Sequence, residues 1–217
     1  MKITKYGHCC VLIEVDGARF LIDPGNYEYA GMGADTKIFR YIDAVIITHE
    51  HQDHFHLPSL NVVLANNRTA KVYTTASVQA LMTAEGRNAE LFDNGQTIMI
   101  KNVPMTGVGA EHAEIYGDFN RVPNTGVLIA NRFFYPGDAF TNPGVPVEIL
   151  ALPIAGPWMK LKEAIDFALA LKPKHAFPVH DGKLKATAAE QKTLTHVLPP
   201  ANIEFLPANL GVAMEFK

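Results

Sequence analysis

The sequence has few of the features that mark membrane, nucleic-acid-binding or secreted proteins. Only two cysteines occur in 217 residues, Cys9 and Cys10, and adjacent cysteines are badly placed to bridge each other. No apolar run approaches the roughly 20 residues of a membrane span, and no apolar signal segment opens the chain. A net charge of −3 without a Lys/Arg-rich run argues against a nucleic-acid partner. We therefore expect a cytoplasmic protein that acts on a small molecule.

The composition is that of an ordinary globular chain. Hydrophobic residues make up 48% of the sequence and charged residues 19%. No repeat, low-complexity tract or linker divides the chain, so we expect one domain over residues 1–217. Nothing in the sequence fixes the oligomeric state.

Short β-branched runs come first, and amphipathic segments follow. Asp16-Gly17 is a hairpin turn signal between expected strands at 9–15 and 19–22. Further strands are expected at 44–47, 72–75, 97–100, 127–135 (two strands that turn near Asn131), 147–152, 175–179, 203–206 and 212–216. Helices are expected at 57–64, at 77–85 with Ser77 as N-cap, at 161–171 and at 186–197. This order favours an α/β fold in which two sheets pack together and helices cover the outside.

The strongest chemical signal is His49-x-His51-x-Asp53-His54, directly after the run at 44–47. In an extended segment residues i and i+2 point the same way, so His49 and His51 can bind one ion together. Asp53 and His54 follow at once and can reach a second position. Imidazole and carboxylate groups suit zinc, iron and manganese. The alternative reading is a solvated polar loop that is rich in histidine.

Three more ligand-type side chains follow expected strands or apolar runs. They are His112 after Val108-Gly109, Asp138 in Gly137-Asp138, and His180 after Pro178-Val179. Each is a weak signal alone, because a histidine at a strand end is usually a satisfied polar residue. Together they predict a metal cleft between two sheets.

This order of residues resembles the metallo-β-lactamase superfamily. Gly7-His8 before a strand, Leu21-Ile22-Asp23-Pro24, and the segments 152–157 and 178–180 resemble one branch in particular. That branch contains ascorbate-6-phosphate lactonase-like and N-acylethanolamine phospholipase D-like members. The resemblance implies an αββα sandwich, made of two packed mixed sheets with helices on the outer faces and a metal cleft at one edge.

The resemblance also implies two divalent metal ions, zinc first, with manganese or iron as alternatives. Carried over by position, the ligands are His49, His51 and His112 for the first ion, Asp53, His54 and His180 for the second, and Asp138 between both. Asp53 would orient the attacking water and move a proton. Asp23 and His8 would contact a ligand or the substrate. An Asx turn before Pro24 and a turn histidine are the alternatives for these two residues.

The resemblance implies a hydrolase that opens a lactone or cleaves an ester or phosphodiester bond in a small molecule. One alternative is a mononuclear iron dioxygenase on the same fold, with His49, His112 and Asp138 as its ligands. Another is a non-catalytic metal-binding protein. Cys9 and Trp158 are expected to serve core packing, with the lining of a pocket as the alternative for Trp158. Lys183 is expected to be a surface charge, with contact to an anionic substrate as the alternative.

Overall fold

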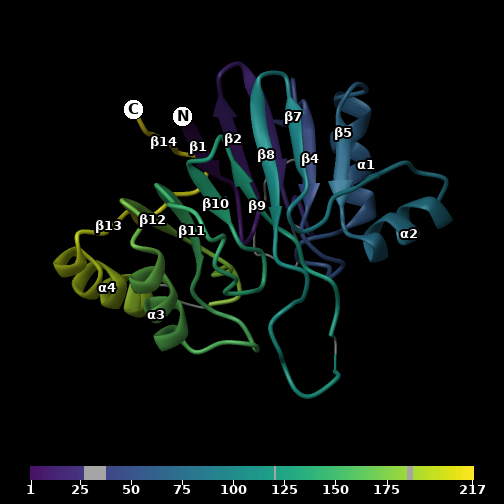
Figure 1. Cartoon of the computed structure of the whole chain (residues 1–217). Coiled ribbons are helices and arrows are strands. Elements are labelled where there is room, and N and C mark those ends of the chain that lie inside the picture. Colours follow the sequence, from purple (N-terminus) through teal and green to yellow (C-terminus); the bar gives the residue numbers. More distant parts are fainter. Residues whose placement is uncertain (27–37, 120, 185–187) are drawn as a thin grey trace.

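Two β-sheets pack face to face, with helices on their outer faces (Figure 1). The structure is a computed structural model, and it describes residues 1–26, 38–119, 121–184 and 188–217. Helices α1 (Leu57–Asn66) and α2 (Ala76–Ala84) lie on one side, while α3 (Leu161–Leu171) and α4 (Ala188–Val197) lie on the other. The αββα arrangement implied by the sequence is therefore confirmed. None of the described helices combines the length and apolar character that a bilayer crossing requires.

The first sheet is built from the N-terminal half of the chain, and the last strand of the chain forms one of its edges. Among the described residues its order is β14-β1-β2-β3-β4-β5-β6. The strands are β1 (Lys2–Lys5), β2 (Val11–Val15), β3 (Ala18–Ile22), β4 (Ala44–Ile47), β5 (Lys71–Thr74), β6 (Glu90–Leu91) and β14 (Ala213–Glu215). Strands β3 to β6 run parallel, and the pairs β14–β1, β1–β2 and β2–β3 are antiparallel.

The second sheet has the order β13-β12-β11-β10-β9-β8-β7 within the described residues. Its strands are β7 (Thr97–Ile100), β8 (Val103–Val108), β9 (Gly126–Ile129), β10 (Phe133–Tyr135), β11 (Ile149–Pro153), β12 (His175–Val179) and β13 (Glu204–Phe205). Strands β10 to β13 are parallel, and the β7–β8, β8–β9 and β9–β10 pairs are antiparallel. A short 3₁₀ turn (Pro199–Ala201) follows α4.

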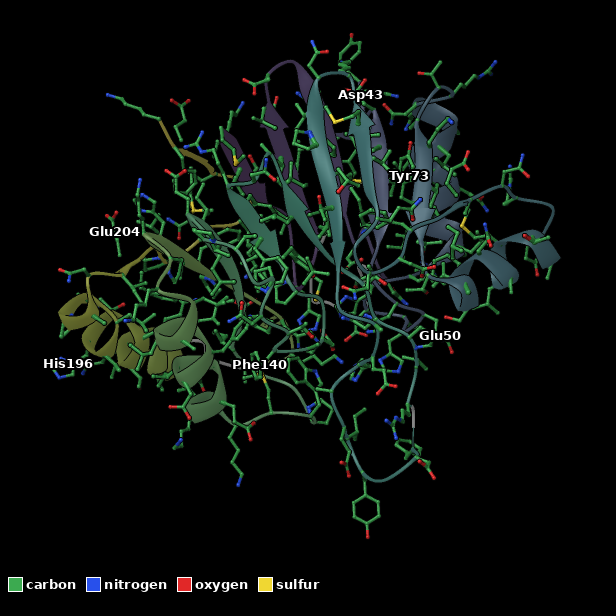
Figure 2. All side chains as sticks on the ribbon, viewed as in Figure 1. Asp43, Glu50, Tyr73, Phe140, His196 and Glu204 are labelled. Atoms are coloured by element: carbon green, nitrogen blue, oxygen red, sulfur yellow. The ribbon has the colours of Figure 1, made fainter. Side chains whose placement is uncertain are left out.

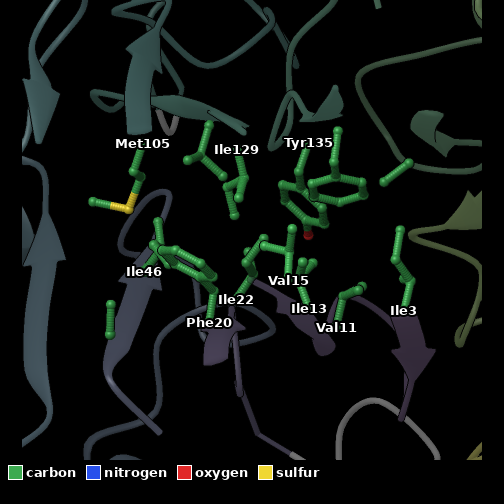
Figure 3. Packing of buried hydrophobic residues seen from close by; sticks show 14 of the residues in the cluster. Ile3, Val11, Ile13, Val15, Phe20, Ile22, Ile46, Met105, Ile129 and Tyr135 are labelled. Carbon is green, nitrogen blue, oxygen red and sulfur yellow. The ribbon is translucent and has the colours of Figure 1, made fainter. Parts of the chain in front are cut away.

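Apolar side chains fill three layers. The inner layer lies between the sheets, where Ile13 and Phe20 of the first sheet face Met105, Ile129 and Tyr135 of the second (Figure 3). A second layer fills the space between the first sheet and α1 and α2, and a third packs the second sheet against α3 and α4. The continuous apolar runs of the central strands follow from this, because those strands are buried on both faces.

Most elements lie where the sequence predicts them, and the exceptions have identifiable causes. Asp16 and Gly17 form the two-residue hairpin turn, both with positive φ, as expected of a twisted hairpin. Strands β1, β6 and β8 were not predicted. Strand β8 was missed because it contains Pro104 and Gly107, which usually break a strand. The assignment of Ser77 as an N-cap was wrong, because helix α2 begins at Ala76 with Thr75 as its N-cap. Residues 186 and 187 of the helix predicted at 186–197 lie outside the described residues.

The strand directions bring one end of both sheets together. Strands β3, β4, β10 and β12 all end there, so the side chains that follow them share one edge of the sandwich. A buried ion pair joins the sheets at this edge, with Lys5 Nζ 2.5 Å from Asp181 Oδ1. Lys5 closes β1, and Asp181 comes two residues after β12 ends at Val179.

We predict that Phe177→Ala destabilises the chain by about 3–5 kcal/mol, because the ring is fully buried and its removal leaves a cavity. Phe177 also stacks on Phe133, with ring centroids 6.3 Å apart. The measurement is urea unfolding followed by circular dichroism. Met99→Ala is the control, because Met99 is exposed and its change should stay within about 0.5 kcal/mol. Equal effects of the two substitutions would contradict the packing described.

Candidate metal centre

All seven predicted ligand residues lie at the shared edge of the two sheets. The first sheet contributes those that follow β4, and the second contributes those that follow β8, β10 and β12. They are His49, His51, Asp53, His54, His112, Asp138 and His180. In Figure 2, Glu50 and Phe140, which neighbour this set in sequence, lie at this end of the sandwich, whereas Asp43 lies at the opposite end.

Asp138 is the centre of the cluster. Its Oδ1 lies 3.2 Å from His54 Nε2. Its Oδ2 lies 2.8 Å from His180 Nε2, 3.4 Å from His112 Nε2 and 3.9 Å from His49 Nε2. Two of these imidazoles follow a strand of the first sheet and two follow strands of the second. The carboxylate is thus a meeting point of the two halves of the fold.

The hydrogen bonds at Nδ1 fix which nitrogen of each histidine is available. His112 Nδ1 lies 2.5 Å from the carbonyl oxygen of Ala113, and His180 Nδ1 bonds that of Ala155. A carbonyl oxygen only accepts, so each Nδ1 carries the proton. In the neutral ring the Nε2 lone pair is then free and directed toward Asp138.

The two histidines of the first sheet are held in the same way by side chains. His54 Nδ1 lies 2.7 Å from Asp23 Oδ2 and donates to it. The Thr48 hydroxyl donates to the same oxygen at 2.7 Å, so it accepts from His49 Nδ1 at 3.0 Å. Asp23, which the resemblance placed near a ligand, is fully buried and orients His54 directly.

The donor atoms fit a metal centre. The Nε2 atoms of His49, His51, His112 and His180 are buried, and none has a hydrogen-bond partner among the residues that the structure describes. The large majority of buried polar atoms in folded proteins are paired, so four unpaired atoms gathered in one place point to a ligand. Among the seven predicted ligands, donor atoms lie within 4.8 Å of one another in three groups that share residues. These groups are His49–His51–His112, Asp53–His54–His180 and His49–His54–Asp138. That these groups bind ions stays a prediction.

Asp53 is held by two donors. His8 Nδ1 accepts from the backbone N–H of Gly182 at 2.8 Å, so the proton of the neutral ring is on Nε2, 3.2 Å from Asp53 Oδ2. Lys183 Nζ lies 2.7 Å from the same oxygen. Burial lowers the pKa of His8 to about 4, so the ring is neutral at pH 7. Burial alone would raise the pKa of Asp53, but its bonds to His8 and Lys183 and the charge of His54 outweigh it and hold that pKa well below the usual range.

The protonation states suit metal ligands. Burial would raise the pKa of Asp138, but His180 and His54 outweigh it and keep the pKa well below its usual range. Burial lowers the pKa of His49 well below that of a free imidazole. His54 is the exception: burial lowers its pKa, but Cys9, Asp138 and Asp23 outweigh that and hold it well above the ordinary value. An ion at His54 Nε2 would therefore replace a proton.

Sequence reasoning underestimated three residues of the site. Trp158 is buried as expected, but its Nε1–H also donates to Asp138 Oδ2 at 2.8 Å. Lys183 is not merely a surface charge, since it bonds Asp53. Cys9 does more than pack, because its Sγ lies 3.4 Å from His54 Nε2. No spacing rule connects these positions to the His-rich motif, so only the fold reveals them.

Two glycines permit the close contacts behind the cluster. Gly25 has φ +51°, and a Cβ there would lie 2.2 Å from the backbone oxygen of Asp53. Gly137 has φ +67°, and a Cβ there would lie 2.2 Å from Asn124 Oδ1. That oxygen accepts from the backbone N–H of Asp138 at 3.1 Å. A side chain at either position would therefore displace the backbone that carries a site carboxylate.

A pocket of about 450 Å³ opens over the cluster. Its size is that of a small-molecule site. Its walls combine charged, polar and apolar side chains, namely Glu50, His51, Gln52, Asp53, His112, Ile115, Phe119, Asp138, Pro157, Trp158, His180 and Lys183. The apolar members lie beside the acids and imidazoles, so a ligand here would contact both kinds of surface.

Comparison with known sequences places most of the chain in one family. Residues 2–180 match the sequence profile of the β-lactamase superfamily domain. The Mycobacterium tuberculosis protein Rv0786c is 32% identical, over 83% of this chain and 84% of that protein. A protein of Pyrococcus furiosus named UPF0173 metal-dependent hydrolase is 25% identical, over 88% of each chain.

A solved structure supports the same fold. Igni18, described as a novel metallo hydrolase from Ignicoccus hospitalis, superposes with a TM-score of 0.76 at 20% sequence identity. The match covers 100% of this chain and 99% of that one. At this identity the likeness shows the architecture alone.

Trp158→Phe should destabilise the metal-free chain by about 1.5–3 kcal/mol, because it removes a hydrogen bond to a charged, buried acceptor. Tyr135→Phe is the matched control, since it removes a buried hydrogen bond to the neutral carbonyl of Cys9. That change should cost about 0.5–1.5 kcal/mol. Urea unfolding in the presence of chelator measures both. A Trp158 cost no larger than the Tyr135 cost would contradict the role assigned to the indole.

Proposed function

The chain belongs to the β-lactamase superfamily, and on that premise we propose that it is a metal-dependent hydrolase of a small molecule. The observation that carries the proposal is the convergence of four imidazole Nε2 atoms on the buried carboxylate of Asp138. Their Nδ1 atoms are tied to oxygen atoms, which leaves the Nε2 lone pairs for ions. The name metal-dependent hydrolase of the Pyrococcus furiosus relative agrees with this assignment.

Two divalent ions, zinc in the first instance, suit the donor set. The proposed ligands are His49, His51 and His112 for one ion, Asp53, His54 and His180 for the other, and Asp138 for both. Imidazole nitrogens with carboxylate oxygens are the ligands of catalytic zinc, and they also accept manganese and iron. A pair of ions would supply a water of lowered pKa and polarise the oxygen of the group under attack.

Asp53 is the residue that we propose to handle the proton. The Nε2–H of His8 and the ammonium of Lys183 fix its Oδ2, so the carboxylate is oriented before substrate arrives. Its low pKa keeps it ionised at neutral pH. The ionised carboxylate can orient the attacking water and take its proton transiently, and because the group is so acidic it returns that proton readily to the leaving oxygen. Lys183, which is partly exposed, stabilises negative charge at the pocket wall.

The pocket favours a small substrate with both apolar and polar parts. Ile115, Pro157 and Trp158 provide an apolar wall beside the acids and imidazoles. We propose that the scissile group is a lactone, an ester or a phosphodiester. All three present an oxygen for polarisation and an electrophilic carbon or phosphorus atom for attack by water.

We expect about two zinc ions per chain after reconstitution, since the cluster holds two sets of donors that share Asp138. Asp138→Ala should reduce that content to one ion or fewer. Plasma mass spectrometry of protein purified without chelator gives the measurement. Asp166→Ala is the control, because Asp166 is exposed on α3 and should leave the content unchanged.

Other metal contents would redirect or reject this proposal. One tightly bound iron per chain with oxygen consumption would favour a mononuclear dioxygenase instead. A chain that retains no zinc, manganese or iron after loading would exclude the catalytic proposal.

Asp53→Asn should lower kcat by about 10²–10⁴-fold on a lactone or phosphodiester that the zinc-loaded chain hydrolyses, because the amide cannot take up a proton. Metal content is measured on the same samples, since Asp53 is also a proposed ligand. His196→Ala is the control, as His196 lies on α4 and points away from the sandwich (Figure 2). Full activity of Asp53→Asn with full metal content would remove Asp53 from the mechanism.

A further inference from the structure

Cys9 lies inside the cluster that we assign to metal binding. It comes just before β2, and its side chain is 1% exposed. Its Sγ lies 3.4 Å from His54 Nε2, the nitrogen that also lies 3.2 Å from Asp138 Oδ1. The next residue, Cys10, is equally buried but faces the other way, into the layer beneath α1 and α2. The two adjacent cysteines therefore occupy different environments.

The surroundings of Cys9 supply a second and independent sign of a ligand. Donor atoms of Cys9, His8 and His180 lie within 4.8 Å of one another. Both histidines are more than nine-tenths buried, and the Nε2 atom of His180 has no hydrogen-bond partner among the described residues. His8 already carries its proton on Nε2, which points toward Asp53. Within this group, the atoms able to ligate an ion are therefore Cys9 Sγ and His180 Nε2.

We propose that Cys9 is a thiolate ligand of the ion held by Asp53, His54 and His180. The inference rests on the proposed metal centre and adds a residue to it. Neighbouring ligands of one five-coordinate zinc, at about 2.3 Å for sulfur and 2.0–2.1 Å for nitrogen, lie about 3.1–3.8 Å apart. The observed separation of Cys9 Sγ and His54 Nε2, 3.4 Å, fits that geometry. On binding, the S–H bond breaks as the sulfur–metal bond forms, and the proton leaves to solvent.

A thiolate would decide which metals this position accepts. Carboxylate and imidazole ligands alone suit manganese, iron and zinc alike, whereas a soft sulfur ligand selects against magnesium and manganese. Cys9 would thus make one half of the centre selective for zinc-like ions. The other half, His49, His51 and His112 with the shared Asp138, has no sulfur donor and keeps the broader choice.

Cobalt substitution tests the assignment on the full chain. Cobalt(II) bound to thiolate gives a sulfur-to-cobalt charge-transfer band in the near ultraviolet, and its d–d bands in the visible report bound cobalt whatever the ligands. We expect both features in the unaltered chain and in Cys10→Ala, the matched control. We expect Cys9→Ala to lose the near-ultraviolet band and keep visible bands.

Two spectra would overturn the role of Cys9 alone: visible bands without a near-ultraviolet band in the unaltered chain, or a near-ultraviolet band that persists in Cys9→Ala. Absence of cobalt binding by the unaltered chain would reject the metal centre and Cys9 together.

If Cys9→Ala does not fold, X-ray absorption of the zinc-loaded unaltered chain replaces it. Sulfur at about 2.3 Å supports the assignment, and only nitrogen and oxygen ligands near 2.0–2.1 Å contradict it.

Discussion

The buried carboxylate of Asp138 is the charge around which the polar end of the sandwich is arranged. It is 3% exposed, and a carboxylate taken out of water costs several kcal/mol unless it is paired. Its partners come from both sheets, with His49 and His54 after β4 and His112 and His180 after β8 and β12. Pairing this one carboxylate thus requires the two sheets to meet in a defined arrangement at this edge.

The backbone is strained at two positions where the sheets meet around Asp138. Asp23 and His180 both have positive φ, at 43° and 57°, directly after β3 and β12. Such conformations cost on the order of 1–3 kcal/mol each and persist where neighbours over-determine them. Asp23 accepts hydrogen bonds from the backbone and the hydroxyl of Thr48, and His180 Nδ1 bonds a backbone carbonyl. The turn that ends each strand is therefore fixed by the same groups that orient the imidazoles.

Sequence patterns predicted the parts of this structure that depend on local physics. The apolar spacing of α3 and the continuous run of β4 gave their bounds directly, because each reflects which faces the core covers. The site motif at 49–54 was also visible, since its residues are adjacent. Strand β8 was not, because Pro104 and Gly107 weaken its local preference while β7 and β9 pair with it on both sides.

The supporting residues of the site escaped prediction for a different reason. Lys183 reaches Asp53 across 130 positions of sequence, and Tyr135 reaches Cys9 across 126. Contacts of this kind depend on how the two sheets are set against each other, and no local pattern records that. The resemblance to a family supplied the ligand order but not the role of Cys9 or Trp158.

Bound to donors drawn from both sheets, a metal ion would also make the stability of this fold depend on the metal content of the buffer. An ion that binds only the folded chain adds RT ln(1 + [L]/Kd), about 2.7 kcal/mol when its free concentration is a hundred times Kd. Because the proposed ligands come from both halves of the sandwich, that free energy would oppose separation of the sheets themselves. A chelator would then lower the free energy of unfolding. A measured unfolding midpoint would depend on the metal concentration of the buffer as well as on the protein.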